Sequence, residues 1–287
     1  MTDVSIAAPA GGLPAYVARP SGPGPFPGVV VVHDAFGLGN EIRAQADWLA
    51  DAGYLAVAPD LFRGRSKVAC MVTIMRDARD RTGPTFDDLE AARQWVATSP
   101  DCTGTVGVIG FCLGGGLALL LAPDRGFSAA SVNYGAASKE AYTAGFLRTA
   151  CPIVGSYGAK DRTLRGAAAR LESALTEVGV DHDVKEYPQA GHAFLNDRVG
   201  AGDRVPALFA VTGRFMHMGY QPDAAADARG RILAFFDRHL RDASPASPPD
   251  CRHPAASLRD VCSAENARRP TGNVRPELRE CASWPST

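Results

Sequence analysis

The sequence lacks the patterns that mark several large classes of protein. It has no run of about 18 consecutive apolar residues, so we expect no membrane-spanning helix. Its N-terminus has no basic segment followed by an apolar run, so we predict no secretory signal and a cytoplasmic protein. Lys and Arg number 30 against 31 Asp and Glu. This balance argues against nucleic acid or a membrane surface as the main partner.

The cysteines also lack a recognisable pattern. All seven are unevenly spaced, and no two form a C-x-x-C pair. Such pairs typify zinc sites and thioredoxin-type redox centres. The sequence therefore predicts no metal site, no thioredoxin-type redox centre, and thiols that stay reduced in the cytoplasm.

What the chain does contain is a regular alternation of strand-like and helix-like segments. This alternation predicts an α/β fold with a mostly parallel central sheet and helices on both faces. Functional side chains should then lie on loops at the carboxyl ends of the strands. The expected strands cover 16–19, 28–33, 54–58, 106–109, 129–134, 153–157 and 183–187, the last near a sheet edge. The expected helices cover 41–51, 86–97, 113–121, 164–178 and 224–240.

The composition changes near the end of the last expected helix. Residues 243–287 are rich in Pro, Ser, Ala and Arg, and show neither a helical nor an alternating apolar period. We therefore predict one α/β domain over residues 1–242 and a disordered C-terminal tail over 243–287.

One cysteine lies at a sharp turn between an expected strand and an expected helix. Gly110-Phe111-Cys112-Leu113-Gly114 has the form G-x-C-x-G, which is the nucleophile elbow G-x-S-x-G with cysteine in place of serine. The flanking glycines let strand and helix approach, and the helix N-terminus favours a thiolate. A buried packing thiol is the alternative interpretation of Cys112.

A carboxylate and a histidine follow this cysteine in the order that such a site requires. Asp161 comes after the strand CPIVGSYG, and His192 comes after the strand DVKEYP. His192 would deprotonate the thiol, and Asp161 would fix the tautomer of the histidine. Asp183 and Asp197 are rival carboxylates for the second role.

An oxyanion hole needs two backbone N–H groups beside the nucleophile. The residue after the nucleophile supplies one of them, which is Leu113 here. The loop after the first long strand, GVVVVH, supplies the other. We expect Ala35 to provide that amide.

At this point the sequence resembles a known family. The segments VVHDAFGL, YLAVAPDLF, GVIGFCLGGG, GSYGAKD and GHAFLND, in this order, are similar to the dienelactone hydrolase family of α/β-hydrolases over roughly residues 3–240. The resemblance implies the α/β-hydrolase fold and a Cys-Asp-His triad at Cys112, Asp161 and His192. It also implies hydrolysis of ester bonds in unsaturated lactones such as carboxymethylenebutenolide, without a cofactor.

Two positions depart from the pattern of that family. Its members carry a glutamate after the first long strand that interacts with the resting thiol, and Asp34 stands there. Dienelactone-specific members hold the substrate carboxylate with arginines, one of them four residues after the histidine, where this chain has Asn196. The other would lie among Arg76, Arg79 and Arg81. The resemblance therefore supports the hydrolytic chemistry more than the dienelactone substrate.

These observations together predict a cysteine-nucleophile esterase or lactonase with a small-molecule ester or lactone as substrate. Phe36, Arg76 and Asn196 are expected to contact the substrate and Asp34 to assist. Arg198 and Arg214 could line an anion pocket, although the favoured interpretation is that they are solvated. A general carboxylesterase or thioesterase on the same scaffold is one alternative. A non-catalytic hydrolase-like binding protein is another. Either a monomer or a dimer is compatible with the sequence.

Overall fold

The computed structural model describes residues 1–203 and 213–242. The chain divides into two units, Met1–Pro245 and Ala246–Thr287, and the described residues all belong to the first. The tail predicted over 243–287 lies outside the described residues. Within the described residues, no helix is both long and apolar enough to span a membrane.

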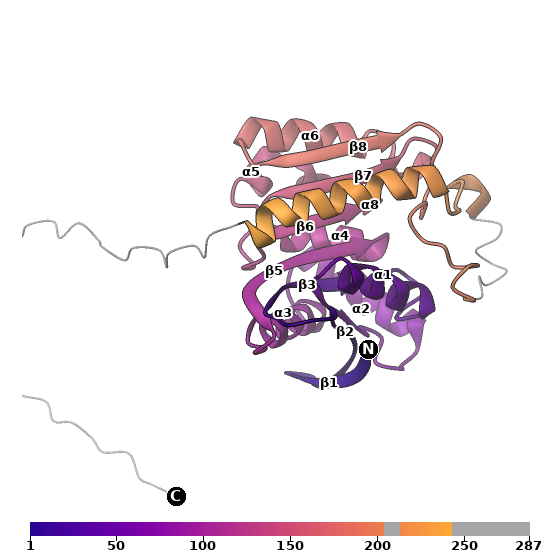
Figure 1. Ribbon diagram of the computed structural model, residues 1–287. Helices are drawn as coiled ribbons and strands as arrows, with labels where there is room; N and C mark the ends of the chain where they lie inside the picture. The colour runs from indigo at the N-terminus through magenta and orange to yellow at the C-terminus, as the bar shows by residue number, and fades with distance from the viewer. Residues whose placement is uncertain (204–212, 243–287) are drawn as a thin grey trace, which may run out of the picture. The chain divides into compact units, whose positions relative to one another are not determined.

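The described unit is built on one eight-stranded sheet with the order β1-β2-β4-β3-β5-β6-β7-β8 (Figure 1). The first strand pairs, β1 with β2 and β2 with β4, are antiparallel, and every later pair is parallel. This confirms the predicted mostly parallel α/β sheet. The strands are β1 (Thr2–Ala8), β2 (Gly11–Ala18), β3 (Phe26–Val32), β4 (Leu55–Pro59), β5 (Cys102–Phe111), β6 (Ala129–Asn133), β7 (Ile153–Gly158) and β8 (His182–Tyr187).

Helices cover both faces of this sheet. Gly28 of β3 pairs with Val106 of β5, so the next residue of β5, Gly107, points to the opposite face. A Cβ at Gly28 would meet Val96, whereas one at Gly107 would meet Leu240, and these two residues belong to different helical segments. Figure 1 shows α8 crossing in front of the strands. The α-helices are α1 (Asn40–Asp51), α2 (Lys67–Asp80), α3 (Pro84–Ala97), α4 (Leu113–Leu121), α5 (Ala144–Leu147), α6 (Ala167–Val178) and α8 (Pro222–Phe236). The shorter turns are η1 (Lys139–Tyr142), η2 (Arg162–Leu164) and η3 (Asp237–Arg241).

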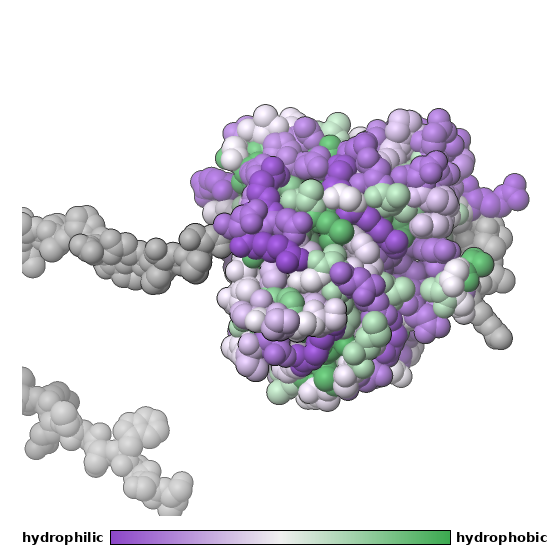
Figure 2. Space-filling model, in the orientation of Figure 1, coloured by the Kyte–Doolittle hydropathy of each residue, from purple (hydrophilic) through white to green (hydrophobic). Residues whose placement is uncertain are grey.

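The buried strands follow directly from their composition. Val29 to Val32 of β3 are fully buried, as expected for a β-branched run in the middle of a parallel sheet. The charged, alternating strand β8 forms the edge, which confirms its predicted position. The face drawn in Figure 2 is mostly hydrophilic, with hydrophobic residues scattered in small groups. The core therefore lies on both sides of the central strands, and the polar side chains discussed below collect at their carboxyl ends.

Strand β1 and helices α2 and α5 were not predicted, and several boundaries were wrong, among them the starts of β2, β5 and α6. Strand β1 was missed because its alternating pattern is weak and consists largely of small and polar residues. Helix α2 was missed because Val68, Val72 and Met75 are exposed, so its apolar positions do not all lie on one buried face. The helix expected from residue 164 begins only at Ala167. Gly166 lies before it in the left-handed region, with φ of 71°, and separates α6 from the turn η2.

Candidate active site

Cys112 occupies a strained turn between β5 and α4. Its φ of 55° lies in the left-handed region, which residues with a side chain rarely adopt. The two glycines of the motif are required by close backbone approach. A Cβ at Gly110 would overlap the carbonyl of Gly114, and a Cβ at Gly114 would overlap the carbonyl of Val32 at the end of β3. The local geometry is thus that of a nucleophile elbow, with the thiol half-buried above the sheet.

His192 and Asp161 come together at the carboxyl ends of β8 and β7. Nδ1 of His192 lies 2.6 Å from Oδ2 of Asp161, and both side chains are almost fully buried. The other oxygen of Asp161 accepts hydrogen bonds from the amide and hydroxyl of Thr163, at 2.9 and 2.6 Å. Burial raises the pKa of Asp161, but these bonds to His192 and Thr163 outweigh it and leave the pKa below its usual range.

The rival carboxylates have other partners. Oδ1 of Asp183 lies 2.7 Å from Nη2 of Arg231, and Oδ1 of Asp197 accepts a hydrogen bond of 2.8 Å from the amide of Gly200. Asp161 is therefore the one of the three candidates that hydrogen-bonds to the histidine.

The imidazole also interacts with the thiol. Burial lowers the pKa of His192, but hydrogen bonds with Asp161 and Cys112 and the charges of both raise it above its ordinary value. The imidazole of His192 is therefore within hydrogen-bonding reach of the Cys112 thiol. Burial raises the pKa of two other half-buried thiols, that of Cys102 and, to about 12, that of Cys151.

Ala35 and Leu113 are the residues whose backbone amides were predicted to form the oxyanion hole. Within the described part of the chain, neither the Ala35 N–H nor the Leu113 N–H donates to another group, and both residues are half-buried. The contact of Gly114 with the end of β3 brings the start of α4 next to the loop that carries Ala35. This arrangement is compatible with the predicted pair of donors to a developing oxyanion.

Asp34 pairs with Arg198, which the sequence interpretation favoured as a solvated side chain. Its carboxylate accepts a hydrogen bond of 2.8 Å from the amide of Phe36 and pairs with the guanidinium of Arg198, whose side chain is 9% exposed. The guanidinium also stacks on the ring of Phe36, 4.1 Å from its centroid. The interpretation of Arg198 as solvated is wrong, because two partners hold it in place away from solvent.

The residues predicted to contact the substrate lie in different surroundings. Asn196 is buried and hydrogen-bonds to Glu41, whereas Arg76 is exposed on α2 and pairs with Asp77 at 3.1 Å. Glu41 was not predicted as a site residue. A signal was present, since Glu41 and Gln45 are one helical turn apart beside the apolar stripe of α1. Within residues 1–203 and 213–242, no group of three or more His, Cys, Asp or Glu side chains could hold a metal ion.

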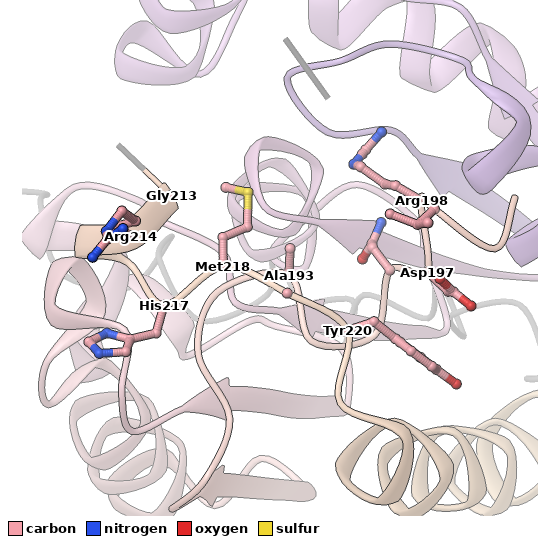
Figure 3. Close-up of a pocket in the computed structure, with 11 residues that line it drawn as sticks. Ala193, Asp197, Arg198, Gly213, Arg214, His217, Met218 and Tyr220 are labelled. Atoms are coloured by element: carbon pink, nitrogen blue, oxygen red, sulfur yellow. The ribbon is translucent and has the colours of Figure 1, made fainter. Parts of the chain in front are cut away.

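A cavity of about 560 Å³ adjoins the loop that carries His192. Figure 3 shows Arg214 and His217 on one side of it and Asp197 and Arg198 on the other. The backbone of His192 is fixed next to this cavity, since its amide donates to the carbonyl of Met216 at 3.0 Å and its carbonyl accepts from Gly219 at 3.1 Å. The segment 213–219 therefore holds the histidine loop in place from outside the sheet.

Comparison with known proteins identifies relatives of this chain. Residues 13–240 match the dienelactone hydrolase family. The chain belongs to this family. A putative carboxymethylenebutenolidase of Azospirillum brasilense is 28% identical over 84% of this chain and all of its own length. A carboxymethylenebutenolidase of Pseudomonas putida is 28% identical over 74% of this chain and 86% of its own.

The fold agrees with that of solved members of the dienelactone hydrolase family. The crystal structure of a putative dienelactone hydrolase from Klebsiella pneumoniae is 28% identical in sequence and superposes with a TM-score of 0.65. The match covers 83% of this chain and 98% of that one. The predicted α/β-hydrolase fold is thus confirmed, and the protein is a hydrolase of the dienelactone hydrolase family.

Proposed function

We propose that the protein hydrolyses ester bonds whose leaving group is an enolate, as in enol lactones and enol esters, with Cys112 as the nucleophile. The observation that supports this most is the contact of His192 with both the thiol and Asp161. The names of its relatives point to the same class of substrate, since the protein of Pseudomonas putida is a carboxymethylenebutenolidase.

The reaction begins with attack of the Cys112 thiolate on the ester carbonyl carbon. The C=O electron pair moves onto oxygen, and the amides of Leu113 and Ala35 stabilise the oxyanion. Collapse of this intermediate breaks the bond to the enol oxygen, and the imidazolium of His192 protonates the enolate. The products of this half-reaction are a thioester on Cys112 and an enol.

Water then completes the reaction. Neutral His192 removes a proton from a water molecule, and the hydroxide attacks the thioester carbonyl. The second tetrahedral intermediate expels the thiolate, the carboxylic acid leaves, and the resting pair is restored. Asp161 keeps the correct tautomer of the histidine and stabilises the imidazolium through both steps. The cytoplasm, where thiols stay reduced, suits this nucleophile.

A thiol nucleophile restricts the choice of leaving group. A thiolate is a better leaving group than an ordinary alkoxide, because a thiol is far more acidic than an alcohol. An intermediate formed from an alkyl ester therefore expels the thiolate and returns to substrate, whereas an enolate can compete with it. We propose the enol-ester class rather than one lactone, because Asn196 stands where the dienelactone-specific members carry an arginine and already bonds to Glu41.

The test compares enol esters with matched alkyl esters. We expect kcat/KM to be at least about 100-fold higher for the enol ester, with both activities lost in Cys112→Ala and His192→Ala. Cys102→Ala, which removes another half-buried thiol, is the control and should retain activity. A thioester adduct on Cys112 should appear by mass spectrometry in the first turnover.

Two results would contradict the proposal. Full activity of Cys112→Ala on the enol ester would exclude this thiol as the nucleophile. Binding of the enol ester with neither turnover nor adduct would favour the binding protein over the enzyme. In that case iodoacetamide should also react slowly with Cys112 and at a rate independent of His192.

A further inference from the structure

A chain of buried hydrogen bonds runs from helix α1 to the wall of the active site. Oε2 of Glu41 accepts a hydrogen bond of 2.5 Å from Nδ2 of Asn196, and Oδ1 of Asn196 accepts one from the hydroxyl of Tyr134. All three side chains are 4% exposed or less. Gln45 adds a bond of 2.7 Å to the other oxygen of Glu41. Nothing in the proposed reaction uses this chain directly.

The far end of the chain contacts the base. The ring of Tyr134 lies 5.2 Å from the ring of His192, centroid to centroid, at a tilt of 59°. Tyr134 directly follows β6 with φ of 40°, so its position is strained and must be held by its contacts. Burial, then the charge of Glu41, then that of Cys112 raise the pKa of Tyr134 well above its usual value. The phenol is therefore within electrostatic reach of both the buried carboxylate and the nucleophile.

We propose that Glu41 is a positioning residue that, through Asn196, holds the phenol of Tyr134 against the imidazole. This inference rests on the proposed function, because it explains how the base is kept in register with the nucleophile. An aromatic face held beside an imidazolium stabilises its positive charge. Small displacements of a catalytic group lower the rate strongly, so fixing the ring that supports it affects kcat more than KM.

Glu41 also reaches the other side of the site. Its carboxylate oxygen lies 3.9 Å from the guanidinium of Arg198, which pairs with Asp34. Asp34 immediately precedes Ala35, the expected donor to the oxyanion. The Glu41 carboxylate is therefore connected to both halves of the site. Through Asn196 it orients the side that carries the base, and through Arg198 it faces the loop expected to carry the oxyanion donor.

The protonation state of Glu41 determines the direction of this chain. An ionised Glu41 only accepts, so Asn196 turns its amino group to the carboxylate and its oxygen to the hydroxyl of Tyr134. A protonated Glu41 can donate, which permits the reversed amide and releases the hydroxyl. The charged and titratable groups that face Glu41 are Arg198 and Asp203 from the loop after β8, Arg229 from α8, and Tyr134. Burial raises the pKa of Glu41 to about 7, although hydrogen bonds from Gln45 and Asn196 lower it.

The experiment measures kcat, KM and their pH dependence with an enol ester for Glu41→Gln, Tyr134→Phe and the double variant. We expect Glu41→Gln to lower kcat by about tenfold with KM within about twofold. Wild-type kcat should rise between about pH 6 and 8, and this rise should be absent from Glu41→Gln. The matched control is Asp47→Asn, since Asp47 is another carboxylate of α1 that accepts a tyrosine hydroxyl, from Tyr16 at 2.7 Å. It should retain wild-type kinetics.

The double variant separates positioning from general stability. If both residues act through one chain, the double variant loses no more than the larger single loss, whereas independent effects multiply. Wild-type kcat and pH profile in Glu41→Gln, or multiplicative losses, would overturn the inference while Cys112→Ala remained inactive. Activity in Cys112→Ala would instead refute the proposed function, so the two failures are distinguishable. If Glu41→Gln changes only the melting temperature and leaves kcat unchanged, Glu41 is not a positioning residue.

Discussion

Replacing Asp161 with Asn tests the geometry of the site most sharply, because Thr163 fixes the orientation of the new amide. The amide and hydroxyl of Thr163 both donate to Oδ1, so the side chain in Asp161→Asn must keep its oxygen there and turn its amino group to His192. Nδ1 of His192 must then accept a hydrogen bond from this amino group, so the ring proton moves to Nε2, the nitrogen that faces the thiol. In that tautomer the histidine cannot take the proton of Cys112.

The expected loss in kcat/KM follows from the hydrogen bond between Asp161 and His192 that the substitution changes. A charge-assisted bond such as the 2.6 Å contact between Asp161 and His192 contributes about 1.5–3 kcal/mol, and the wrong tautomer adds to this. The same change in serine-type triads lowers kcat by about 10⁴-fold. We therefore expect kcat/KM for an enol ester to fall by about 10²–10⁴-fold, with a melting temperature close to that of the wild type.

The assay is steady-state hydrolysis together with the rate of iodoacetamide alkylation of Cys112 at pH 7. Alkylation should slow in Asp161→Asn, because less thiolate is present without the imidazolium partner. Asp183→Asn is the matched control, since Asp183 pairs with Arg231 and should tolerate the change with little effect on kcat/KM. A value of kcat/KM for Asp161→Asn within about threefold of the wild type would refute the reasoning.

Three further changes have outcomes that the structure predicts. Gly114→Ala should destabilise the fold by about 1–3 kcal/mol or more and abolish activity, measured by urea unfolding and steady-state hydrolysis, because its Cβ would overlap the carbonyl of Val32. Arg198→Leu should cost about 3–5 kcal/mol of unfolding free energy at pH 8, since it leaves the buried Asp34 carboxylate unpaired, and a loss below about 1 kcal/mol would contradict this. Because the folded-state pKa of Glu41 is raised to about 7, its contribution to stability is present at low pH and is lost as the pH rises towards 7. The free energy of unfolding of Glu41→Gln, measured in urea, should therefore rise by up to about 3 kcal/mol relative to that of the wild type between about pH 5 and 8. A difference that stays constant with pH would contradict the raised pKa of Glu41.

The catalytic candidates could be placed from the sequence because each follows a strand. Parallel strands end at one edge of the sheet, so Cys112, Asp161 and His192 were expected to meet there, and the structure brings them together. The elbow could be recognised because the G-x-C-x-G pattern occupies five consecutive residues between an expected strand and an expected helix, although the group that excludes a side chain at Gly114 is the distant carbonyl of Val32. Local pattern and strand order were sufficient for this part of the site.

The supporting residues could not be predicted in the same way. Glu41 and Arg198 look like ordinary surface charges in sequence, since charged residues are seldom buried. Their burial depends on contacts between α1 and the loop after β8, residues about 155 positions apart in the chain. Tyr134 was expected as the last residue of a strand, and only the three-dimensional structure shows its ring against His192. Long-range pairing of polar groups leaves no periodic signal.

The free-energy cost of burying the Glu41 carboxylate helps to distinguish a positioning role from a purely structural one. An apolar side chain of similar volume in a buried polar network often gives equal or greater stability, so the carboxylate is poorly explained by stability alone. Its ionised form is disfavoured by burial yet is the form that fixes Asn196 and Tyr134 in one arrangement. If the ionised state is the productive one, stability and kcat should change in opposite directions as the pH rises from about 6 to 8. A purely structural Glu41 would give no such opposition, because kcat would then follow the folded fraction alone.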